Sequence, residues 1–156
     1  MKAATISELK QELAHLPPSK LQELCLRLAK FKKDNKELIT YILFEAHDIP
    51  AYIEQVKQEI DTCFEDINTS NVYFAKKTLR KILRNTDKYI RYCAEPTADI
   101  ELRIYFCNRM KEQQLPINRN PVLKNMYQNQ LKKIEKTMGT LHEDLQYDYR
   151  REIDLL

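Results

Sequence analysis

Positively charged side chains are concentrated between residues 71 and 93, a segment whose only acidic residue is Asp87. They are Lys76, Lys77, Arg80, Lys81, Arg84, Lys88 and Arg91. At 100° per residue, a helix places them on an arc of about 140°, and apolar residues occupy the opposite side. Tyr73 projects within this arc and Tyr92 lies close to its edge. Cations can neutralise phosphates, and aromatic rings can stack on unpaired bases. The pattern therefore favours contact with a nucleic acid.

We name six of these residues the basic face: Lys77, Arg80, Lys81, Arg84, Lys88 and Arg91. A second interpretation starts from the preceding segment, 48–67, in which only Lys57 is positive. Its acidic residues are Asp48, Glu54, Glu59, Asp61, Glu65 and Asp66. The two segments are joined by a short Asn-Thr-Ser-Asn link, which predicts an antiparallel helix pair with charges along both edges. Each exposed ion pair would contribute less than about 1 kcal/mol, but together they would neutralise the basic face.

Signatures of catalysis are absent from the sequence. Gly139 is the only glycine, whereas phosphate-binding loops, dinucleotide fingerprints and nucleophile elbows each need at least two. His15, His47 and His142 are too far apart to share one helix face, and Glu12 with His15 forms a lone Glu-x-x-His. A di-iron bundle repeats that motif on two helices and adds two further glutamates. We therefore expect no catalytic residue, no metal site and no cofactor, although an enzyme built from residues distant in sequence stays open.

Composition predicts a globular chain with a core. Apolar residues make up 43% and charged residues 31% of 156 residues, which favours a single domain over 1–156. The longest apolar stretch, 38–46, is much shorter than the roughly 20 residues of a membrane span, so we expect no membrane contact. The four cysteines contain no Cys-x-x-Cys pair. We interpret them as buried free thiols in a cytoplasmic protein.

Helix starts are easy to locate. Thr5 with Glu8 forms a capping box, and Pro50, Pro96 and Pro121 stand where first helical turns begin. The apolar spacing predicts helices near 6–14, 19–33, 35–46, 49–67, 71–93, 97–114 and 121–154, and no strand signal occurs. The fold class is therefore all-α, with about seven helices. Because 38–46 and 100–107 are apolar nearly all round, we expect them to be the most buried segments.

Two arrangements of these helices are open. One is an antiparallel helical bundle. The other is a short α–α superhelical array, suggested by a weak alignment of Lys30 with Lys81 that also matches Ile39 to Ile90. At this general level the second arrangement is similar to the helical pairing of HEAT or armadillo repeats.

The last predicted helix, 121–154, is too long for a compact domain. Its apolar residues follow the four–three spacing of a coiled-coil seam: Tyr127, Leu131, Ile134, Met138, Leu141 and Leu145. A continuous helix would measure about 51 Å at 1.5 Å per residue, against a diameter of about 39 Å for a globule of this size. Either the helix breaks near Gly139, or it extends beyond the domain and packs on a partner.

These observations lead to two hypotheses about function. The leading one is a non-enzymatic helical interaction module that binds a protein partner or a second copy of itself. Tyr147, Tyr149 and Arg150 are its candidate interface, because aromatic residues and arginine are enriched in protein interfaces. The alternative is a protein that binds nucleic acid through the basic face, independently of sequence.

Overall fold

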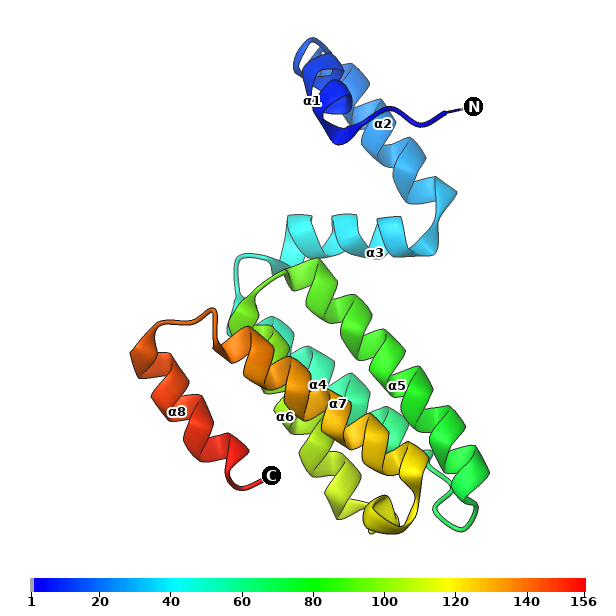
Figure 1. Cartoon of the computed structure of the whole chain (residues 1–156). Helices are drawn as coiled ribbons and strands as arrows, with labels where there is room; N and C mark the ends of the chain where they lie inside the picture. The colour runs from blue at the N-terminus through cyan, green and yellow to red at the C-terminus, as the bar shows by residue number, and fades with distance from the viewer. Residues whose placement is uncertain (1) are drawn as a thin grey trace. The chain divides into compact units, whose positions relative to one another are not determined.

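The chain is all-α in a computed structural model that describes residues 2–156 (Figure 1). No strand occurs in this part of the chain, so the predicted fold class is confirmed. The helices are α1 (Ile6–Ala14), α2 (Pro18–Phe31), α3 (Lys33–Thr40), α4 (Ile49–Glu65), α5 (Val72–Cys93), α6 (Pro96–Glu112), α7 (Pro121–Met138) and α8 (Glu143–Ile153). A π-helical turn, Tyr41–Glu45, follows α3, and a 3-10 turn, Ile117–Arg119, precedes α7.

The helices form two compact units, Met1–Phe44 and Glu45–Leu156, where length and composition predict one domain over 1–156. In the first unit, α1 begins with the predicted capping box. The Glu8 amide donates to Thr5 Oγ1 at 3.3 Å, and the Thr5 amide donates to the Glu8 carboxylate at 2.7 Å. The bonds that the Thr5 amide and hydroxyl donate to the Glu8 carboxylate lower the pKa of Glu8. Helix α2 packs against α3.

The first unit buries very little apolar surface. Tyr41 is the only buried side chain among residues 2–44, while Ile6 and Phe31 are each 81% exposed. The prediction that 38–46 is among the most buried segments is wrong, since Ile42, Leu43 and Phe44 are exposed. An apolar run marks a buried helix only where other elements cover every side of it, and here only Tyr41 is covered.

The second unit is a bundle in which α4, α5, α6 and α7 run alternately in opposite directions (Figure 1). Helix α6 packs against α4, α5 and α7. It therefore needs apolar residues on all sides, and the prediction that 100–107 is deeply buried is confirmed. The core includes Phe64 and Phe106, whose ring centroids lie 5.6 Å apart.

The predicted helix over 121–154 is interrupted at Gly139. Helix α7 ends at Met138, where the Gly139 amide donates to the Glu135 carbonyl at 3.1 Å. Helix α8 starts four residues later, and its first amides are capped by His142. Ile134 and Met138 pack on Ile100 and Ile104, with Leu131, Leu141, Tyr149, Ile153 and Leu156 around them. The four–three spacing therefore reflects packing inside the unit, and α7 is only about 27 Å long.

None of the helices in the described part of the chain combines the length and apolar composition that crossing a membrane requires.

Candidate nucleic-acid interface

Helix α5 carries the basic face on its solvent side. Its buried residues are Ala75, Leu79, Ile82, Thr86, Ile90 and Cys93. They anchor the helix in the bundle and leave the opposite side to the cations. Lys77, Arg80, Lys81, Arg84 and Arg91 are exposed. Lys88 is half-buried, with its ammonium 5.1 Å from the centre of the Tyr89 ring and 5.9 Å from that of Tyr92.

The acidic residues of α4 do not neutralise the basic face. Asp61 forms an ion pair with Arg109, whose Nε lies 2.8 Å away, and accepts a hydrogen bond from the Tyr105 hydroxyl at 2.6 Å, and both partners belong to α6. Glu59 accepts from the Tyr89 hydroxyl at 2.6 Å. Glu54 pairs with Lys57 of its own helix.

The cations of the basic face are thus left to solvent. Within residues 2–156, Lys77, Arg80, Lys81, Arg84 and Arg91 make no salt bridge. Of the two interpretations that the sequence leaves open, the structure therefore agrees with an exposed basic face.

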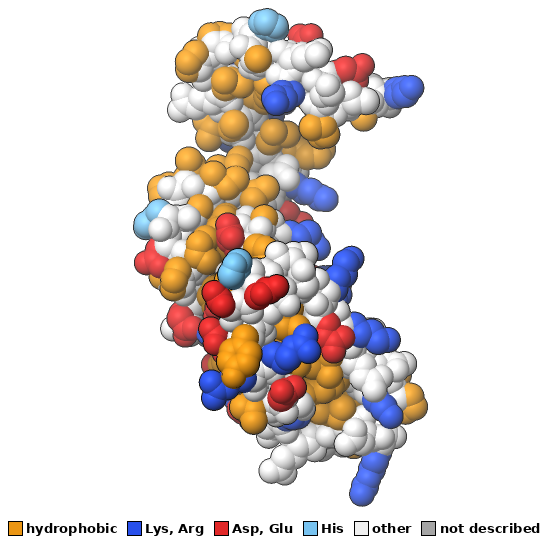
Figure 2. Space-filling model, turned by 60° about the vertical axis from the view of Figure 1, so that its left-hand side comes forward, with side chains coloured by type: hydrophobic (Ala, Val, Ile, Leu, Met, Phe, Trp, Pro, Cys, Tyr) orange, Lys and Arg blue, Asp and Glu red, His pale blue; other side chains and the backbone are white. Residues whose placement is uncertain are grey.

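A second row of cations lies on α7 and was not singled out from the sequence. It consists of Lys124, Lys132, Lys133 and Lys136, all exposed. Together, α5 and α7 contain eleven positive and two negative side chains, a net charge of +9, while the whole chain carries +3. The first unit carries +3, so the second unit outside α5 and α7 carries −9, and charge is strongly segregated within this unit. In Figure 2, acidic side chains gather where α8 comes forward, and basic side chains follow one edge of the second unit.

A groove of about 600 Å³ lies between α5 and α7, with Arg80 on one wall and Lys132 and Lys133 on the other. We call it the α5–α7 groove. Its walls are Arg80, Leu83 and Asp87 on α5, and Val122, Asn125, Met126, Asn129, Gln130, Lys132 and Lys133 on α7. The groove thus combines positive charge at its rim with apolar and amide side chains inside.

A buried ion network holds the two walls of this groove on α6. Arg103, with 7% of its side chain exposed, lies between two carboxylates, with Nη1 2.8 Å from Asp87 and Nε 2.7 Å from Asp99. Its Nη1 also donates to Gln130 of α7 at 2.7 Å. The second oxygen of Asp99 accepts from the Thr137 hydroxyl at 2.6 Å. Bonds of this kind fix the spacing between α5 and α7 because a buried charge is costly without its partners.

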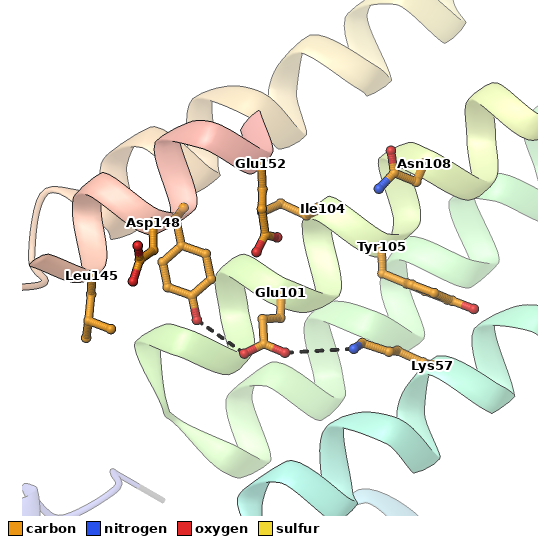
Figure 3. Close-up of a pocket in the computed structure, with 9 residues that line it drawn as sticks. Lys57, Glu101, Ile104, Tyr105, Asn108, Leu145, Asp148 and Glu152 are labelled. Carbon is orange, nitrogen blue, oxygen red and sulfur yellow. Dashed lines mark hydrogen bonds and ion pairs between the residues drawn. The ribbon is translucent and has the colours of Figure 1, made fainter. Parts of the chain in front are cut away.

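The opposite face of the bundle holds an acidic pocket of about 480 Å³ between α4, α6 and α8 (Figure 3). Glu101 lies at its centre, where it accepts from the Tyr149 hydroxyl at 3.2 Å and lies 3.8 Å from the Lys57 ammonium. Burial, together with the neighbouring Glu101, raises the pKa of Tyr149 to about 12. Burial and the hydrogen bond to Asp61 likewise raise the pKa of Tyr105 to about 12. Phosphates would be repelled from this pocket.

The three residues of the predicted protein interface, all on α8, do not lie on one exposed surface. Tyr149 belongs to the chain's own contact between α8 and α6, whereas Tyr147 and Arg150 are exposed.

No group of three or more His, Cys, Asp or Glu side chains in residues 2–156 is placed to hold a metal ion. Cys93 and Cys107 are buried free thiols, but Cys25 is exposed and Cys63 only partly covered.

Comparisons of this chain with protein-family models, with curated proteins and with solved structures found no match.

Proposed function

We propose that this chain is a helical module that binds the phosphate backbone of a nucleic acid through the basic face of α5 and the lysines of α7, without reading base sequence. The main support is that five cations of the basic face are exposed and make no salt bridge within residues 2–156. Lys or Arg side chains that neutralise phosphates release condensed counterions, which supplies most of the free energy of non-specific binding.

The observations favour a nucleic acid over other anionic partners. An anionic membrane would require an apolar surface beside the cations, but the apolar side of α5 is buried in the bundle. The hypothesis of a protein partner rested on the absence of site signatures and on an overhanging C-terminal helix, and α7 ends at Met138. The basic face, in contrast, extends along most of a 22-residue helix of about 33 Å, a length that suits a polymer of phosphates.

Binding to fluorescent DNA and RNA oligonucleotides, measured by anisotropy at rising salt, tests this proposal. We expect log Kd to rise linearly with log salt, with a slope of roughly 0.7 to 0.9 per phosphate contacted. The double variant Lys81→Glu, Arg84→Glu should weaken binding at least tenfold. Lys10→Glu, Lys30→Glu applies the same change of charge to exposed residues of the first unit and should leave Kd nearly unchanged. Absence of binding at low salt to every single-stranded and duplex probe would refute the proposal.

Self-association through the first unit is a second candidate function. It is supported by the exposed apolar side chains of α1 and α2, among them Ile6, Leu9, Leu13, Leu28 and Phe31. These helices have nine and fourteen residues, and helices this short are marginal unless they bury an apolar face. A second copy of the chain presents the same apolar faces and could bury both sets in a symmetric helical bundle.

Light scattering over a wide concentration range tests self-association. We expect a dimer that Ile6→Glu, Phe31→Glu shifts to monomer, because each new carboxylate would be buried without a partner. Leu155→Glu is the matched control, since Leu155 is 82% exposed at the other end of the chain. A monomer at all concentrations would exclude this candidate.

A further inference from the structure

Helical geometry places an aromatic ring in line with part of the basic face. Relative to Arg80, a rotation of 100° per residue brings Tyr73, Lys76, Arg84 and Arg91 within an arc of about 80°. From Tyr73 to Arg91 this stripe is about 27 Å long, the length of roughly eight phosphates at 3.4 Å each. Arg80 is the member of this stripe that also lines the α5–α7 groove, so the stripe meets the groove at Arg80.

Tyr73 is available for stacking. Its side chain is 68% exposed, and the neighbouring Phe74 is 51% exposed. The two rings meet edge to face, with centroids 5.5 Å apart, which orients the Tyr73 ring without covering it. A base stacks on such a ring only when it is unpaired at the strand surface, because a duplex hides the faces of its bases.

The interior of the α5–α7 groove is better suited to bases than to phosphates. Leu83, Val122 and Met126 provide apolar contact, and Asn125 and Asn129 offer amide donors and acceptors. Asp87 also lines the groove, and a carboxylate repels phosphates but accepts hydrogen bonds from base amino groups. The volume of about 600 Å³ is in the range of small-ligand sites, which suits one or two nucleosides and not a duplex.

We infer that the α5–α7 groove binds a single-stranded nucleic acid, whose phosphates contact Arg80 and Lys132 at the groove and continue along the stripe to Arg84, while an unpaired base stacks on Tyr73. This inference rests on the proposed function and adds the form of the nucleic acid. The separation of roles is physical: the cations supply affinity that depends on salt, and the ring supplies affinity that does not.

Anisotropy titrations with an unstructured 20-nucleotide strand and its blunt 20-base-pair duplex test the inference. We expect the strand to bind at least tenfold more tightly. Tyr73→Ala should weaken strand binding at least fivefold and leave the salt slope and the duplex affinity unchanged. Tyr147→Ala is the matched control, because Tyr147 is also 68% exposed but lies on α8. Circular dichroism verifies that each variant is folded.

The possible failures are distinct. Equal binding of strand and duplex, or no effect of Tyr73→Ala, would overturn the inference while the proposed function stands, provided that Lys81→Glu, Arg84→Glu still weakens binding at least tenfold. If neither probe binds at low salt, the proposed function and the inference both fail.

Discussion

Lys133 of α7 reaches Asp87 of α5, with its Nζ 3.3 Å from each carboxylate oxygen. Asp87 also forms an ion pair with Arg103 of α6, so one side chain joins three helices. This carboxylate has two opposite effects on the α5–α7 groove. It forms an ion pair with one of the lysines at the rim, and it helps to keep the walls of the groove at a fixed distance.

Replacing Arg103 with Met should destabilise the second unit by about 3–5 kcal/mol, because Asp87 and Asp99 would lose a partner that compensates their burial. Urea unfolding followed by circular dichroism measures this free energy. Arg109→Met is the matched control and should cost much less, since its ion-pair partners Asp61 and Glu112 are 37% and 57% exposed. If the two variants are equally stable, the Arg103 network does not hold the bundle.

Stability should fall in alkali between about pH 10 and 12. Burial raises the pKa of Tyr105, Tyr127 and Tyr149 from 10 to about 12 in the folded chain. Below pH 10 both states keep these protons, but at higher pH the unfolded chain releases them first, so unfolding becomes easier until the folded state also titrates.

Urea midpoints at pH 8, 10 and 11 measure this effect. Tyr149→Phe removes one of the three groups and should make the fall shallower than in the wild type. Tyr147→Phe, at an exposed position, should keep the wild-type slope. Identical slopes for wild type and Tyr149→Phe would show that Tyr149 does not contribute.

The four cysteines should differ widely in reactivity toward a thiol reagent at pH 8. Cys25 is exposed and should react first. Cys107 is fully buried, and burial raises its pKa to about 12, so almost no reactive thiolate forms. Cys25→Ser should remove the fast phase, and Cys107 should react only after urea is added. Modification of Cys107 at the rate of Cys25 would contradict the packing of α6.

Gly139→Ala should be tolerated. Gly139 has a right-handed backbone conformation, with φ −61° and ψ −11°. A methyl group there would contact the Lys136 and Glu135 carbonyl oxygens at 3.5 and 3.7 Å, which are ordinary distances. Alanine reduces the entropy of the unfolded chain, so we expect a gain of about 0.4–1 kcal/mol in urea unfolding. A loss of more than 1 kcal/mol would mean that the turn requires glycine.

The sequence predicted most helices because their starts depend on local chemistry. The Thr5 capping box and the prolines in the first turns of α4, α6 and α7 act within one helical turn. The break at Gly139 depends instead on how Leu141 and Tyr149 pack back on α6, which is a tertiary effect. For the same reason, the apolar segment 38–46 could not be placed correctly from its composition.

The sequence predicted the part of the candidate site that lies on α5 but not the part that lies on α7. The basic face is a run within one helix, so periodicity reveals it. The lysines of α7 are separated from that run by about forty residues, and only the placement of both helices on α6 brings Lys133 within reach of Asp87. The detectable signal would have been the charge of 121–138 taken alone, which contains four lysines and one glutamate.

The opposite signs of the two faces of the bundle have a consequence for the rate at which the proposed nucleic-acid partner would bind. A net +9 on α5 and α7, balanced by −9 on the remaining residues of the second unit, gives this unit a large electric dipole. In the field of a polyanion such a dipole turns before contact, so encounters begin with α5 and α7 foremost. Fewer collisions are then lost to wrong orientations, and at low salt the association rate can exceed what a uniformly distributed charge of +3 would allow.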